Sequence, residues 1–144
     1  MIEQDTIKLL RECDAGIKMG TESIDDVLEY VHDGEFKNHL SRCKDEHRAL
    51  GKELEGMLDM YGDDGKEPNM MAKGMSYLKT NVKLSYDNSD HMIADLMTDG
   101  CNMGVKSLNK YLNKYKAADE KSKDITKRLI RLEQKLTEDI RGYL

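Results

Sequence analysis

The residues best able to do chemistry in this chain are four histidines, three cysteines and many acidic side chains. A di-iron or di-manganese site in a helical bundle takes one Glu from each of two helices and a Glu-x-x-His pair from each of two others. His47 has Lys44 three residues before it, and Glu133 has Leu136 three residues after it. Neither pair completes the motif, so the sequence argues against an oxygen-activating metal centre.

A simpler metal site stays open as an alternative. It would combine His47 with residual side chains able to bind a cation, namely Asp14, Asp95, Asp99, Cys101 and Glu133. A soft metal needs three or four such ligands. We expect instead that the ring of His47 lies in the core and is satisfied by a neighbouring side chain or water. On that interpretation His47→Leu is tolerated or stabilising, because the apolar side chain avoids a desolvation cost.

The cysteines Cys13, Cys43 and Cys101 are odd in number and far apart, which is typical neither of a disulfide framework nor of a zinc ribbon. We expect three buried, reduced thiols. Burial raises a thiol pKa, so nucleophilic catalysis is not expected. The sequence predicts no catalytic residue and no cofactor, and therefore no enzyme.

Helices must position these side chains. Apolar residues alternate at intervals of three and four along four segments, at about residues 2–32, 36–61, 89–115 and 118–142. The Asp33-Gly34 pair separates the first two segments, and Asn88 or Ser89 can cap the third. The 144 residues fit one domain over the whole chain, 1–144, and the predicted fold class is all-α.

The connection between the second and third segments is too long for a tight turn. It begins with the loop at residues 62–68, which holds the only proline, and continues with an apolar stretch from Met70 to Val82. That stretch predicts a short crossing helix. Two antiparallel hairpins joined by one long crossover make a ferritin-like four-helix bundle.

The helical stripes also predict what surrounds His47. Counting along the four segments places Ile17, Gly20, Cys101 and Leu132 at its level, whereas Cys13 and Cys43 fall at other levels. The interior at the level of a ferritin metal site is therefore expected to be mainly apolar and small.

Several short motifs resemble a bacterial family of uncharacterised ferritin-like proteins. They are the segments 46–54 and 62–68, the Asp14-Ala15-Gly16 run, Gly74, Leu78, Lys79 and Tyr111. The resemblance covers nearly the whole chain and implies the ferritin-like fold. It implies no activity, because none is established for that family. Relatives tend to carry an acidic residue before the tyrosine where this chain has Gly104.

Composition limits the partners. The formal net charge is −5 with basic and acidic residues mixed, so no broad positive face is expected to follow a nucleic-acid backbone. No stretch reaches the roughly 20 apolar residues of a membrane span, and the first five residues include no apolar run. We therefore expect a cytoplasmic protein that contacts neither nucleic acid nor membrane.

The remaining function class is protein association. Ten methionines are present, and Met70 lies with Tyr77 and Tyr86 in or beside the expected crossing helix. Pliable methionine and aromatic side chains suit a contact surface. The sequence predicts a non-catalytic ferritin-like bundle that acts as a homo-oligomer or with another protein, through Met70, Tyr77 and Tyr86.

Overall fold

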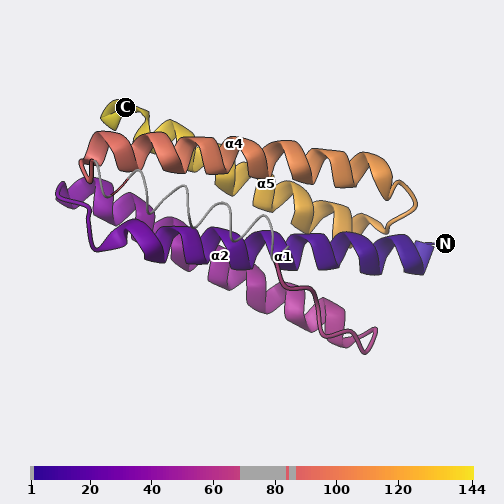
Figure 1. Ribbon diagram of the computed structural model, residues 1–144. Coiled ribbons are helices and arrows are strands. Elements are labelled where there is room, and N and C mark those ends of the chain that lie inside the picture. The colour runs from indigo at the N-terminus through magenta and orange to yellow at the C-terminus, as the bar shows by residue number, and fades with distance from the viewer. Residues whose placement is uncertain (1, 69–83, 85–86) are drawn as a thin grey trace.

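A computed structural model describes residues 2–68, 84 and 87–144. Over these residues the chain is helical without strands, which confirms the all-α prediction. The long helices are α1 (Ile2–Leu28), α2 (Gly34–Asp59), α4 (Asp90–Lys114) and α5 (Glu120–Ile140), followed by the 3₁₀ turn η1 (Arg141–Tyr143). They pack side by side as four helices of a bundle (Figure 1).

Side-chain caps explain where three of the helices begin. The carboxylate of Asp33 accepts a hydrogen bond from the backbone of Phe36, and that of Asp119 accepts one from the backbone of Ser122. The hydroxyl of Ser89 does the same for Met92, as expected for a residue that could cap the third helix. The first predicted segment was too long, because α1 ends at Leu28 and a turn leads to the Asp33 cap.

The helix directions follow from two hydrogen-bonded ends. Asp90, the first residue of α4, accepts bonds of 2.8 Å from the backbone nitrogens of both His32 and Asp33, in the turn between α1 and α2. At the other end, the backbone nitrogen of Ala117 donates to Asp5, near the start of α1. Helices α2 and α4 therefore run in one direction and α1 and α5 in the other (Figure 1).

The predicted crossing helix from Met70 to Val82 lies outside the described residues. The same holds for the three residues expected to form the contact surface, Met70, Tyr77 and Tyr86. Their roles remain predictions.

The core has two apolar clusters, stacked along the bundle. The Phe36 cluster lies toward the α1–α2 turn and includes Ile24, Leu40, Ile93 and Ile140. The Leu54 cluster lies toward the α4–α5 turn and includes Leu10, Ile17, Leu108 and Leu129. Burial of these stripes is what holds the four amphipathic helices together.

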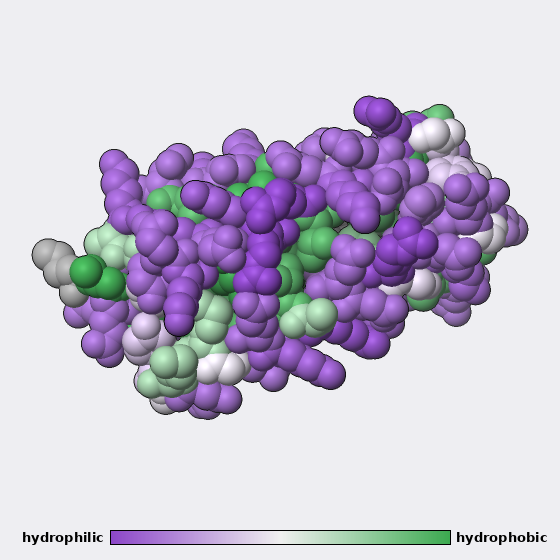
Figure 2. All heavy atoms as spheres, turned by 180° about the vertical axis from the view of Figure 1, so that it is seen from behind, coloured by the Kyte–Doolittle hydropathy of each residue, from purple (hydrophilic) through white to green (hydrophobic). Residues whose placement is uncertain are grey.

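Most exposed side chains of the described residues are hydrophilic. Figure 2 shows one face on which polar and charged side chains dominate and hydrophobic side chains appear in gaps between them. In the parts of the chain that the structure covers, no helix is long and apolar enough to cross a membrane.

Candidate functional site

A buried ion pair lies between the two apolar clusters. His47 of α2 is 1% exposed, and its Nε2 atom lies 2.9 Å from Oε1 of Glu133 on α5. The other ring nitrogen, Nδ1, lies 2.8 Å from the backbone oxygen of Cys43, one turn earlier on α2. Two helices thus supply one acid and one base to the middle of the core.

Gly20 makes room for this pair, and Gly104 lies beside it. A Cβ atom on Gly20 of α1 would lie 3.0 Å from Nε2 of His47, which is tighter than nine in ten real Cβ contacts. A Cβ atom on Gly104 of α4 would lie 3.6 Å from the carboxyl carbon of Glu133. The layer therefore takes one position from each helix, with the glycines of α1 and α4 facing the charged side chains of α2 and α5.

The hydrogen bonds favour the protonated form of His47. The carbonyl oxygen of Cys43 can only accept, so Nδ1 donates to it, and Nε2 donates to the carboxylate of Glu133. Burial alone lowers the pKa of His47, but hydrogen bonds to Cys43 and Glu133 and the negative charge of Glu133 outweigh it and raise that pKa to about 10. The ring is an imidazolium at neutral pH.

Two thiols flank the pair. The sulfur of Cys43 lies 3.5 Å from Nδ1 of His47, so the expectation that Cys43 falls at another level is wrong. Residues four apart on a helix are neighbours, which brings Cys43 and His47 together. Burial and the carboxylate of Glu133 raise the pKa of Cys101 on α4. Cys101 is therefore a protonated thiol near Glu133.

Cys13 belongs to a different part of the core. Its sulfur lies 3.1 Å from the hydroxyl oxygen of Thr126, and that hydroxyl donates to the backbone oxygen of Ser122. The thiol of Cys13 is therefore the donor to Thr126. Burial raises the pKa of Cys13 to about 12, and the thiol stays protonated at neutral pH.

The interior around His47 differs from the prediction at one position. Leu132 was expected to face it, but Leu132 is half-buried beside the Leu54 cluster and Glu133 is the buried neighbour. Going from Leu129 to Leu136 by three and then four residues selects Leu132, and going by four and then three selects Glu133. Both spacings fit a helical stripe. Leu132 was predicted because it is apolar, but Glu133 is the residue that faces His47.

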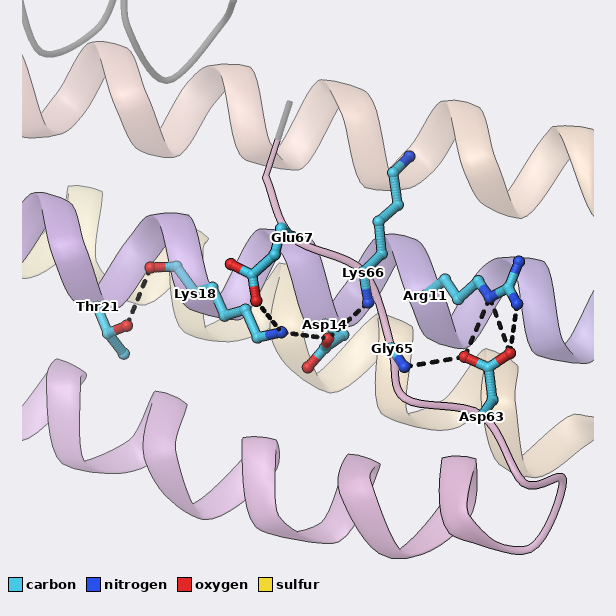
Figure 3. A network of polar contacts seen from close by, with 8 residues as sticks. All are labelled: Arg11, Asp14, Lys18, Thr21, Asp63, Gly65, Lys66 and Glu67. Carbon is cyan, nitrogen blue, oxygen red and sulfur yellow. Dashed lines mark hydrogen bonds and ion pairs between the residues drawn. The ribbon is translucent and has the colours of Figure 1, made fainter. Parts of the chain in front are cut away.

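Asp14 lies apart from His47, under a segment that follows α2. Its carboxylate is buried and accepts from the backbone nitrogen of Lys66 at 2.9 Å and from Nζ of Lys18 at 2.9 Å. Figure 3 shows residues 63–67, which we call the strap, lying along α1 with Asp14 between Lys18 and the strap. Gly65 of the strap has φ +85°, and a Cβ atom there would come 2.2 Å from a carboxylate oxygen of Asp14.

Ion pairs hold the strap to α1. Arg11 contacts the carboxylate of Asp63 through two nitrogens, and Lys18 reaches Glu67 at 3.0 Å (Figure 3). The contact to Arg11 lowers the pKa of Asp63 and raises that of Arg11. Asp14 is thus a structural carboxylate that fixes the strap, and not a neighbour of His47.

The residues at the His47 level do not fit a two-metal centre. Asp95 is half-buried on α4 and Asp99 is exposed, and both take part in other interactions. Within residues 2–68, 84 and 87–144, no group of three or more His, Cys, Asp or Glu side chains is placed to hold a metal ion. A two-metal site requires four carboxylates and two neutral imidazoles, whereas this layer offers one carboxylate, one imidazolium and two glycines.

Comparison with known proteins gives no relatives. No protein-family model matches the chain, and neither curated proteins nor solved structures give a match.

Proposed function

We propose that this chain is a non-catalytic, ferritin-like helical bundle of the cytoplasm, with α2 and α4 joined by a long crossover, and that it acts by associating with protein. The partner is a second copy or another protein. The shared direction of α2 and α4 supports the ferritin-like arrangement, because their connection has to return along the bundle. The similarity of its motifs to a bacterial ferritin-like family is part of the same proposal.

The observation that carries the proposal is the saturation of His47. Both ring nitrogens donate to partners inside the protein, and an imidazolium has no lone pair to offer a metal or a substrate proton. The thiols of Cys43 and Cys101 are buried, and Cys101 is held in its protonated form. Because these interior groups bind one another, the proposed association uses the surface of the bundle.

Sedimentation velocity and metal analysis test this proposal together. Protein purified without chelator is expected to contain no stoichiometric metal and to sediment above the monomer at tens of micromolar, or to do so when its partner is added. Replacing Met70 and Tyr77 by Glu, while helical circular dichroism stays unchanged, tests the contact surface expected from the sequence. Iron, manganese or zinc at one or two ions per chain would contradict the proposal.

A metal-binding ferritin-like protein is the second candidate. The convergence of His47 with Glu133, and of Glu133 with Cys101, favours it, because these side chains are the core of the ligand set expected from the sequence. Binding would require His47 to lose a proton and Glu133 to leave it. Titration with zinc at pH 8 would then release protons from the wild type and none from Glu133→Gln, and the absence of release would remove this candidate.

A further inference from the structure

The strap at residues 63–67 brings no hydrophobic side chain to its contact with the bundle. Its residues are Asp, Asp, Gly, Lys and Glu. Gly65 is the part that approaches the core, since a Cβ atom there would lie 3.5 Å from Leu58 of the Leu54 cluster. The four helices, by contrast, are held together by two buried apolar clusters. The contacts that hold the strap closed are therefore polar and differ in kind from those that hold the bundle.

Most of these polar contacts are open to solvent. Three ion pairs of 2.5–3.0 Å join the strap to α1: Asp63 with Arg11, Glu67 with Lys18 and Lys66 with Glu12. The cation of each pair is 33–47% exposed at its side chain. Water and salt therefore screen all three pairs, and each favours the closed strap by no more than roughly fivefold.

One contact of the strap is shielded from water. The backbone nitrogen of Lys66 donates at 2.9 Å to the carboxylate of Asp14, which is buried (Figure 3). A hydrogen bond to a charged, buried acceptor is stronger than a neutral one and is screened less by salt. Asp14 also binds Nζ of Lys18 on its own helix at 2.9 Å. Because Lys18 stays with Asp14, the strap can leave α1 without leaving that carboxylate unpaired.

The strap is tethered at both of its ends. Gly62 precedes it with φ +65°, and the backbone nitrogen of Gly62 donates at 3.0 Å to the backbone oxygen of Asp59, the last residue of α2. Pro68 follows the strap and is buried. Glycine tolerates large changes of φ and ψ, so Gly62 and Gly65 can absorb the change in backbone angles when the strap lifts. The strap can thus move between two fixed ends while the helices keep their places.

We propose that the strap is a salt-sensitive clasp, which opens from α1 as one unit while the four helices stay folded. Opening breaks the three screened ion pairs and the hydrogen bond to Asp14, and it uncovers one face of α1. Arg11, Asp14 and Lys18 share that face, because they follow at intervals of three and four. Ionic strength thereby controls which surface α1 presents. The clasp goes beyond the proposed function and does not rest on it.

Hydrogen exchange of the Lys66 amide, followed by NMR on the wild type, measures opening of the clasp. This amide is freed when the strap lifts, whereas the amides of Leu50 and Leu54 in α2 are freed only when the bundle unfolds. At low salt we expect protection of about 100-fold at Lys66 and of at least about 10⁴-fold at the two core amides. In 1 M NaCl the protection of Lys66 should fall about tenfold, while that of the core amides should change less than about threefold.

A variant of the strap tests the ion pairs without changing the core. Asp63→Asn with Glu67→Gln keeps the shape of both side chains but removes the charges that pair with α1, so the protection of Lys66 should fall about tenfold at low salt. The matched control is Asp64→Asn with Glu55→Gln. It changes the net charge equally at two exposed positions, one of them in the strap, and it should keep wild-type protection.

Four results would overturn the clasp. Protection of Lys66 as strong as that of the core amides would mean that the strap opens only on unfolding. Protection below about threefold would mean that the strap is not closed. Protection that ignores both NaCl and the strap variant would mean that the ion pairs do not hold it, and a loss in the control equal to that of the strap variant would mean the same. None of these results bears on the proposed association, which sedimentation velocity measures separately.

Discussion

Two of the ion pairs between α2 and α5 lie in opposite surroundings. His47 and Glu133 are 1% and 11% exposed at the side chain, between the two apolar clusters. Glu53 and Arg128 are 49% and 36% exposed, and Arg128 reaches both oxygens of the Glu53 carboxylate. The same two helices thus carry one pair shielded from water and one pair within it.

The comparison shows that geometry alone does not decide what an ion pair contributes. The exposed pair has short, bidentate contacts, yet water and salt screen it in the folded state and solvate it in the unfolded state. Water and salt do not screen the buried pair. If one partner were removed, the charge of the other would stay buried without a counter-charge. A buried pair is therefore recognised by a large loss of stability when one partner is removed and a smaller loss when both are removed.

The largest effect is expected for His47→Leu. It leaves the carboxylate of Glu133 buried without its partner and should destabilise the protein by about 3–5 kcal/mol in urea unfolding. This reverses the expectation from sequence that His47→Leu is tolerated, because the structure supplies a buried partner. The double variant His47→Leu with Glu133→Met should recover most of the loss. A double variant as unstable as the single one would show that the loss does not come from the unpaired carboxylate alone.

The next effect is the pH dependence of the buried pair. The pKa of His47 is about 10 in the folded state and about 6.5 in the unfolded state, so the folded protein binds the proton more tightly. The stabilisation is fully present below pH ~6.5 and is lost as the pH rises through 10, with a total on the order of 5 kcal/mol. Urea unfolding at intervals of pH measures it. Subtracting the same series for the double variant removes other groups, and an unchanged difference between pH 7 and 10 would refute the buried imidazolium.

A smaller effect is expected at Gly65, where the strap packs against the buried carboxylate of Asp14. Gly65→Ala places a methyl group against Asp14 and also strains a residue with positive φ, so it should cost about 2 kcal/mol. Gly62 provides the matched control, because it has φ +65° but no atom within 4 Å of a new Cβ. Gly62→Ala should cost about 1 kcal/mol from backbone strain alone. Equal losses in the two variants would mean that Asp14 does not pack against the strap.

The smallest effect is expected at the exposed pair. Arg128→Met removes the bidentate contact to Glu53 but keeps an alkyl chain, and it should cost about 0.5 kcal/mol at low salt. The loss should fall toward zero in 1 M NaCl, since both side chains are partly exposed. Thermal unfolding at the two salt concentrations provides the measurement. A salt-independent loss near that of His47→Leu would erase the contrast between the two pairs.

The helices themselves were readable from local signals. Intervals of three and four between apolar residues predicted four long helices, and Asp33 and Ser89 mark the starts of α2 and α4. Such signals act within one or two turns of chain, so no knowledge of neighbours is needed. The same holds for Cys13, Cys43 and Cys101, whose places on apolar stripes predicted their burial.

Tertiary structure alone decided which polar groups meet. Position 132 or 133 could face inward with equal helical spacing, and the choice depended on His47 across the interface. The ion pair joins residues 86 apart in sequence, and Gly20, which makes room for it, lies on a third helix. Spacing along one helix determines its apolar face, but only packing against other helices determines what that face meets.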